Sequence, residues 1–167
     1  MSSTKMLCSM LDELHKRFLA VTKDLSEDDL TFKNEKSSPA IGWTIGHLAG
    51  GQHVYLRLIF LGELPSQVEK YEAFNTGTDS TYVNVPSFKE MISFYESEFI
   101  ELRKFIENLS DTDLNAPSPH RDRVPPFFQD TPLRDILASY LAHAFTHIGQ
   151  VIEIRRLLGR DISNINE

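Results

Sequence analysis

The chain has 167 residues, 41% hydrophobic and 25% charged, which suits a globular protein with one hydrophobic core and is too short for two comfortable domains. Its formal net charge of −7 argues against direct nucleic-acid binding. No apolar run reaches the roughly 20 residues of a membrane span, and acidic residues come too early for a secretory leader. We therefore expect one domain over residues 1–167, cytoplasmic and without membrane attachment.

The first half of the chain contains two segments with the apolar spacing of amphipathic helices. The first covers about residues 4–24, where large apolar residues recur every three or four positions. The second is predicted to begin at Ser38-Pro39, a capping serine followed by a proline at the first helical position. It should end near Leu61, because Gly62 follows and glycine is common just beyond a helix C-terminus.

The second half contains two further helical segments. The third helix is predicted to start near Ser87, where Glu90 completes a capping box. The fourth opens at Thr131-Pro132 and continues to about Leu158, where Gly159 ends it.

Two long connections separate these helices. Residues 65–86 are polar and broken by proline and glycine, and a connection of this length either covers an active site or carries a short helix. Residues 110–130 contain four prolines and no sustained periodicity. Similar segments at 25–30 and 109–114 follow the first and third helices, which suggests two helix pairs. The predicted fold is all-α, a four-helix bundle with two long connections and no substantial sheet.

Histidines provide the main functional clue. His143 and His147 are four residues apart in the fourth helix, so their side chains leave it on the same face. Their neighbours are largely apolar, so we expect both histidines to lie away from the solvated face. His47 lies near the centre of the second helix in a similarly apolar setting. A chance pair on a helix face is one interpretation. The other is a metal site of His47, His143 and His147, because a buried imidazole needs a partner and three ligands leave coordination positions open. Cys8 is the only cysteine, so a thiolate cluster is excluded.

Glycines surround the histidine of the second helix. Gly42, Gly46 and Gly50 recur every four residues, and Gly51 is on the same side of the helix as His47. Each costs roughly 1 kcal/mol relative to alanine inside a helix. One explanation for these glycines is the close approach of another helix or of a ligand. The other is tight packing that has no functional meaning.

Further candidates lie near the three histidines. Gln150, three residues after His147, either orients a ligand or is a polar residue at the edge of the core. Tyr140 lines a cavity or fills the core, and Gly51 faces the same region. His53, six residues from His47, is expected at the surface.

Two segments resemble the DinB/YfiT-like superfamily. One is Ile41-Gly-Trp-Thr-Ile-Gly-His47-Leu-Ala-Gly50, and the other is His143-Ala-Phe-Thr-His147-Ile-Gly-Gln150. Helix order and histidine placement agree over most of the chain, whereas the two connections carry no match. The chain departs from the family after the last helix, where Gly159-Arg-Asp-Ile-Ser stands in place of a proline-rich tail, a change that bears on the entrance to the site.

The resemblance implies a four-helix bundle with a metal site between helices, often in a homodimer. The three metal ligands of the family correspond to His47, His143 and His147 of this chain. Members hold zinc, nickel or other divalent ions, and imidazole suits iron as well. Characterised relatives are thiol-dependent transferases or isomerases that use low-molecular-weight thiols, and others are described as metal-dependent hydrolases.

These features predict a metal-dependent enzyme that activates a small thiol for transfer to a small-molecule substrate. A divalent ion held by neutral imidazoles keeps its charge and favours the deprotonated form of a thiol or water. The alternatives are a hydrolase that uses a metal-bound water and a non-catalytic helical metal-binding or dimerisation module. No glutamate stands beside the histidines as in a His-Glu-x-x-His protease, so no catalytic base is assigned, and this favours the thiol.

Overall fold

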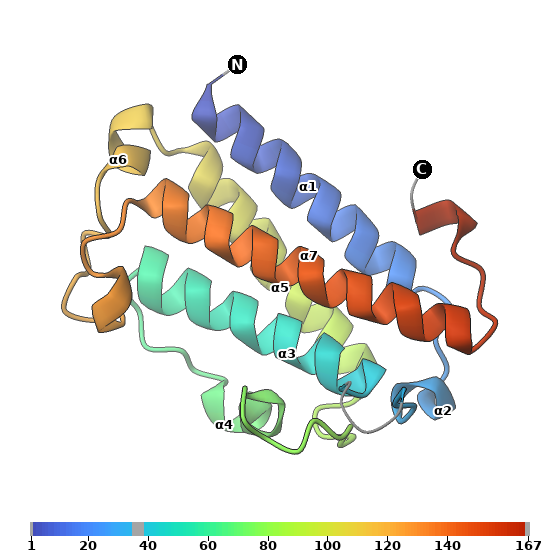
Figure 1. Ribbon diagram of the computed structural model, residues 1–167. Coiled ribbons are helices and arrows are strands. Elements are labelled where there is room, and N and C mark those ends of the chain that lie inside the picture. The colour runs from blue at the N-terminus through green and yellow to red at the C-terminus, as the bar shows by residue number, and fades with distance from the viewer. Residues whose placement is uncertain (1, 35–38, 166–167) are drawn as a thin grey trace.

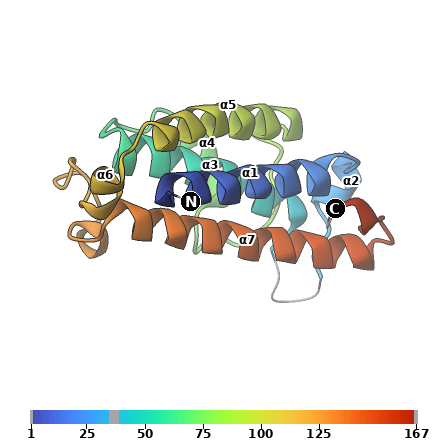
Figure 2. The same cartoon turned by 90° about the horizontal axis from the view of Figure 1, so that it is seen from above.

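Four long helices lie side by side in the computed structural model, which describes residues 2–34 and 39–165 (Figure 1). They are α1 Ser3–Thr22, α3 Ile41–Val54, α5 Phe88–Glu107 and α7 Leu133–Leu157. α1 packs against α5 and α7, and α3 packs against the same two helices. α1 and α7 run in one direction while α3 and α5 run in the other (Figures 1 and 2).

The remaining elements are short helices, so the all-α prediction is confirmed. No strand occurs within the described residues, and the one isolated bridge among them pairs Pro117 with Pro132. None of the described helices is long and apolar enough to cross a membrane. The short elements are α2 Glu27–Leu30, π-helix η2 Tyr55–Phe60, α4 Val68–Tyr71, 3-10 helix η3 Glu72–Phe74, α6 Asp111–Asn115, 3-10 helix η4 Pro126–Phe128 and 3-10 helix η5 Ser163–Ile165.

One cluster of buried apolar side chains lies between the long helices. α1 shows why the sequence folds this way, because its buried residues recur every three or four positions and therefore share one face. Their polar neighbours lie on the opposite face, toward solvent. The buried apolar residues of α1 are Leu7, Cys8, Leu11, Leu14, Phe18 and Val21.

The second predicted helix needs two corrections. Its α-helical part begins at Ile41 with Ala40 as the N-cap, so Pro39 precedes the helix rather than occupying its first position. Ser38, the predicted cap, lies outside the described residues. The last six residues before Leu61 form the π-helix η2 instead of an α-helix. The predicted end is right, since Gly62 has a φ of +65°, the left-handed conformation that glycine adopts without strain.

The third and fourth helices begin in different ways. α5 has the predicted capping box, in which Ser87 and Glu90 each bond the other's backbone N–H. α7 begins at Leu133 after Pro132, which is its N-cap and offers no side-chain bond. Its end before Gly159 agrees with the prediction, and that glycine has a φ of +67°.

The first connection is long because α3 and α5 run in the same direction. The chain must return along the length of the molecule between them, and it does so along α3, as the position of α4 shows (Figure 1). Residues 65–86 carry α4 and η3 on this path, which confirms the short helix considered for them. Residues 110–130 were expected to lack periodic structure, yet they also carry two short helices, α6 and η4.

The chain after α7 returns to α1 and α2. Arg155 is buried and donates to the carbonyl of Val21, the carboxylate of Asp24 and the carbonyl of Asp161. Arg160 pairs with Asp29 over 2.5 Å. These bonds hold the C-terminal segment at the end of the molecule where α1 finishes.

Candidate metal site

The three predicted histidines come together between α3 and α7. Their potential ligand atoms all lie within 4.8 Å of one another. Nε2 of His47 is 3.1 Å from Nε2 of His143, and the ring centroids of His143 and His147 are 4.5 Å apart. Residues nearly a hundred positions apart in the sequence thus form one cluster, because α3 and α7 are neighbours in the fold.

This donor set fits a divalent metal ion. Zinc–imidazole bonds are about 2.0–2.1 Å long in tetrahedral sites, which places two ligand nitrogens roughly 3.3 Å apart. The 3.1 Å between Nε2 of His47 and Nε2 of His143 is close to that value, and the ligand atom of His147 lies within 4.8 Å of both. The three histidines are the one group of this kind among the described residues.

His47 is held in a defined orientation and tautomer. Its Nδ1 is 2.7 Å from the carbonyl oxygen of Phe74, which can only accept, so Nδ1 carries the proton. The ring also stacks on the indole of Trp43 at a centroid distance of 4.8 Å. The Nε2 lone pair of neutral His47 therefore points to the cluster, as a metal ligand requires.

Gln150 orients the third histidine. Its Oε1 is 2.8 Å from Nδ1 of His147, so this nitrogen donates and the Nε2 of His147 remains available. This hydrogen bond is the orienting contact that was one of the two alternatives for Gln150. His143 is the exposed member of the group, contrary to the expectation that the apolar flanks would bury both histidines of α7.

Burial keeps the cluster uncharged. Loss of hydration lowers the pKa of His47 and His143, and it lowers the pKa of His147 to about 4. The bond to Gln150 opposes part of the shift at His147, and the neighbouring imidazoles add to it. Three neutral imidazoles at neutral pH are the protonation states that metal binding needs.

The glycines of α3 allow the first connection to approach. A Cβ at Gly42 would lie 2.3 Å from the ring of Tyr82, one at Gly46 would lie 2.5 Å from the ring of Phe74, and one at Gly50 would lie 2.9 Å from Tyr71. Close packing against the connection therefore explains these three glycines, and the connection that they admit presents the Phe74 carbonyl to His47. Gly51 is different, since a Cβ there would meet nothing within 4 Å.

A cavity of about 300 Å³ adjoins the cluster. Gly51 and Tyr140 both line it, and Tyr140 also belongs to the buried core, whereas Gln150 is not among the lining residues. None of the described residues after Gly159 lines it either. The lining residues are His47, Leu48, Gly51, Gln52, Tyr55, Thr76, Ser139, Tyr140 and His143.

Several residues of the site were not identified from the sequence. The Phe74 carbonyl is a backbone group and carries no sequence signal. Gln52 is buried, donates to the carbonyl of Tyr95 and accepts from the Tyr140 hydroxyl, each over 2.8 Å. A polar residue one turn after His47 and beside Gly51 was the available signal for it.

His53 is not at the surface, so that prediction was wrong. It is 3% exposed, and its Nδ1 lies 2.9 Å from Oε2 of Glu98 on α5. Arg57 from η2 binds the same carboxylate with two of its nitrogens. This buried cluster joins α3, η2 and α5 and is separate from the three histidines.

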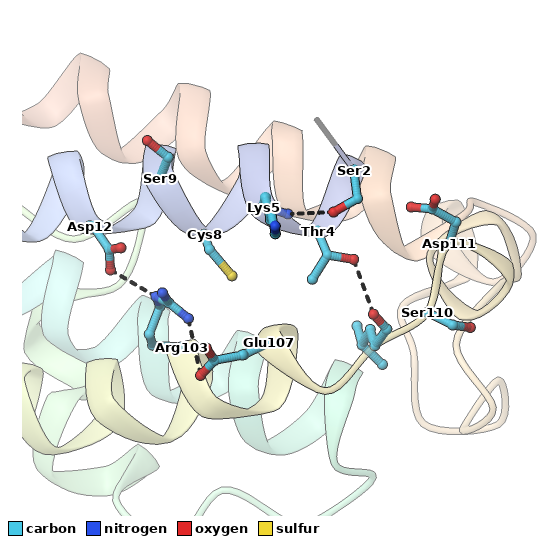
Figure 3. A pocket seen from close by; sticks show the side chains of 11 residues that line it. Ser2, Thr4, Lys5, Cys8, Ser9, Asp12, Arg103, Glu107, Ser110 and Asp111 are labelled. Carbon is cyan, nitrogen blue, oxygen red and sulfur yellow. Dashed lines mark hydrogen bonds and ion pairs between the residues drawn. The ribbon is translucent and has the colours of Figure 1, made fainter.

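A larger cavity of about 500 Å³ lies at the N-terminal end of α1 (Figure 3). The Cys8 sulfur points into it, but burial raises the pKa of this thiol, which makes it a poor nucleophile. Arg103 on the opposite wall is engaged by Asp12 and Glu107. Cys8 belongs to the core, as expected, and this cavity offers no group of metal ligands.

Comparison with known proteins identifies the family. No curated protein matches the chain. The family model of the DinB superfamily matches residues 10–151, which include all four long helices in whole or in large part and all three histidines. The chain therefore belongs to the DinB superfamily.

Proposed function

We propose that this protein is a metal-dependent enzyme in which His47, His143 and His147 hold one divalent ion and activate a low-molecular-weight thiol for transfer. The observation that carries the proposal is the convergence of three neutral imidazoles beside a cavity. Zinc and nickel are the metals we favour, and imidazole also accommodates iron.

The ligand number supports a reactive site over a structural one. Structural zinc sites are closed by four protein ligands, whereas catalytic sites have three and keep a position for substrate. Three histidines make up the group within the described residues, and no carboxylate joins them. The cavity borders His47 and His143, so a substrate can reach the same side.

A divalent ion at this position would supply Lewis acidity and favour the deprotonated form of a thiol. The protein's own residues provide the orientation. The Phe74 carbonyl holds the proton of His47 on Nδ1, and Gln150 does the same for His147. Each of these two rings then has its Nε2 lone pair available to a metal.

The composition of the cavity supports a thiol over a water nucleophile. No aspartate or glutamate lies among the described residues that line it, so a general base for hydrolysis is missing there. A thiol with an ordinary pKa near 8.5 needs only a modest shift to ionise at neutral pH, whereas water needs a much larger one. Hydrolysis remains the alternative activity, and a non-catalytic metal-binding module is the alternative without chemistry.

Metal analysis of protein purified without a metal-affinity tag tests the proposal. We expect one equivalent of a divalent metal in the parent protein, and less than one tenth of that in His143→Ala and His147→Ala. His120→Asn is the matched control, because its ring packs near Gly62 outside the site. If His143→Ala and His147→Ala retained the metal content of the parent, the proposed ligands would be refuted.

Activity separates an enzyme from a binding module. A panel of small thiols with a chloronitrobenzene acceptor should give thioether product that is lost with a chelator and restored by added zinc or nickel. A metal-loaded protein that releases no product above the uncatalysed rate would favour the non-catalytic module. We also propose a homodimer, on the basis of the family resemblance, which sedimentation velocity can test.

A further inference from the structure

The cavity beside the three histidines has an uncharged lining. None of the described residues around it is a lysine, arginine, aspartate or glutamate. Its aromatic wall is formed by Tyr55 and Tyr140, whose ring centroids are 5.1 Å apart. Gly51, one turn before Tyr55, contributes no side chain to the lining, and a Cβ there would meet nothing within 4 Å. The lining side chains provide no counter-ion, so a charged group placed away from the histidines would lose hydration without compensation.

The size of the cavity suits a small ring compound. An apolar cavity of about 150 Å³ is enough to hold benzene, and this one measures about 300 Å³. Aromatic rings prefer offset or edge-on contacts at centroid distances of about 4.5–7 Å. A planar molecule can make such contacts with Tyr55 and Tyr140 while the space above Gly51 accepts its substituents.

The two tyrosine hydroxyls of the wall differ in one decisive respect. The hydroxyl of Tyr140 is buried and donates to Oε1 of Gln52 over 2.8 Å. The hydroxyl of Tyr55 makes no hydrogen bond within the described part of the chain, and Tyr55 is half-buried at the cavity. Burial also raises the pKa of Tyr55, so the phenol keeps its proton and acts as a donor.

Tyr55 stands at the point where α3 becomes the π-helix η2. Single π-turns of this kind are uncommon and frequently occur at functional sites. Gly51 precedes Tyr55 by one helical turn, and His47 precedes it by two, so all three lie along the side of the helix that faces the cavity. Tyr55 and His47 thus border the same cavity from one continuous helical segment.

We propose that this cavity binds an uncharged, planar organic molecule with one hydrogen-bond acceptor, and that Tyr55 is the specificity-determining donor to that acceptor. This inference rests on the proposed function, in that the bound molecule is the one that receives the thiol. For a carbonyl acceptor the step balances without a further reactant. The sulfur–carbon bond forms, the π electron pair of the carbonyl moves to oxygen, and the proton lost by the thiol ends on that oxygen. Tyr55 donates a hydrogen bond to the oxygen throughout.

Binding of two matched probes tests this inference without any measurement of activity. Acetophenone carries a carbonyl acceptor, and ethylbenzene has nearly the same shape without one. We expect both to shift the NMR signals of cavity residues in the metal-free protein, with tighter binding of acetophenone. Tyr55→Phe should weaken acetophenone binding about threefold to tenfold, the worth of one hydrogen bond, and should leave ethylbenzene binding within twofold of the parent.

Two further variants serve as controls, one outside the cavity and one that fills it. Tyr82→Phe loses a hydroxyl that bonds Glu27 and Asn84 outside the cavity, so acetophenone binding should not change. Gly51→Leu fills the cavity and should abolish binding of both probes. Charge is tested with 4-acetylbenzoate, which we expect to bind the metal-free protein at least tenfold more weakly than acetophenone. Equal affinity of the parent and Tyr55→Phe for acetophenone would overturn the role of Tyr55, and tight binding of 4-acetylbenzoate would overturn the uncharged class.

The outcome is distinguishable from failure of the proposed function. If the parent protein holds no metal but binds acetophenone through Tyr55, the pocket stands and the thiol-transfer proposal falls. If the parent holds metal and transfers a thiol while Tyr55→Phe binds and reacts like the parent, the function stands and this inference falls.

Discussion

The carbonyl oxygen of Phe74 accepts a hydrogen bond from Nδ1 of His47 over 2.7 Å. This bond links the first connection to the histidine cluster, because Phe74 ends η3 and its ring packs against Gly46 of α3. The indole of Trp43 strengthens the link by donating to the carbonyl of Ala73 and to the hydroxyl of Thr78. The orientation of one histidine therefore depends on how a connecting segment docks on the helix that carries it.

Replacement of two glycines by alanine should have opposite effects on stability. Gly46→Ala places a Cβ 2.5 Å from the Phe74 ring, so the connection must shift, at a cost of about 1–3 kcal/mol in the free energy of unfolding. The same shift should weaken metal binding. Gly51→Ala meets nothing within 4 Å and should stabilise the helix by about 0.5–1 kcal/mol. Urea unfolding of both variants measures the difference, and equal stabilities would contradict the packing argument.

Loss of the Gln150 side-chain amide should weaken metal binding without unfolding the protein. Gln150→Leu removes the acceptor that holds His147 in place. Groups that orient a metal-binding histidine are typically worth 10- to 100-fold in affinity, and we expect a loss in that range. Competition with a chromogenic chelator measures it. Glu153→Gln, at an exposed position with its carboxylate on Arg156, is the control and should retain the parent's affinity.

The buried carboxylate of Glu98 should matter for stability and not for metal content. Glu98→Gln leaves buried His53 without its charged partner and weakens the bonds from Arg57, so the free energy of unfolding should fall by about 2–4 kcal/mol. Glu101→Gln removes an exposed partner of Arg57 and should cost less than about 0.5 kcal/mol. A Glu98→Gln protein as stable as the parent would show that the cluster is dispensable.

Acid should weaken the attachment of the C-terminal segment. The hydrogen bond from Arg155 holds the pKa of Asp24 below its ordinary value. A carboxylate with a lowered pKa in the folded state contributes stability above the unfolded pKa of about 4 and loses that contribution as the pH falls through the folded value. Asp24→Asn should therefore cost about 1–3 kcal/mol at pH 7, since it weakens a bond to a buried guanidinium.

The pH dependence supplies the check on that prediction. As the pH falls from about 4 through the lowered folded pKa of Asp24, the stability of the parent should approach that of Asp24→Asn, because Asp24 is protonated first in the unfolded state and then in the folded state. Thermal unfolding at pH 7 and pH 3 measures the two differences. A gap between parent and variant that stays constant over this range would mean that the ion pair with Arg155 contributes nothing.

Much of the architecture was predictable from local patterns. The four long helices, the capping box at Ser87 and Glu90, and the glycine end of the second helix follow from periodicity and capping chemistry, which act within a few residues. The start of α3 and the π-helix η2 were not predicted, since packing against other elements decides how a helix begins and where its hydrogen bonds change register.

The burial of individual polar residues was harder to predict. His53 lies six positions from His47, and this spacing correctly indicated that the two side chains leave α3 on different faces. The spacing could not indicate that the face with His53 meets Glu98 on α5. Helical periodicity gives the direction of a side chain relative to its own helix. Which neighbour covers that direction depends on the arrangement of all four helices.

The sequence by itself determined the helix content, the pairing of His143 with His147 on one face, and the candidate role of His47, because these depend on spacing along the chain. Only the tertiary structure decided that the parallel run of α3 and α5 sends the first connection back along α3, where the Phe74 carbonyl meets His47. It also decided that a cavity without charged side chains, lined in part by Tyr55, adjoins the cluster. Contacts of this kind form between residues far apart in sequence, and for them the physical determinant is packing geometry rather than local propensity.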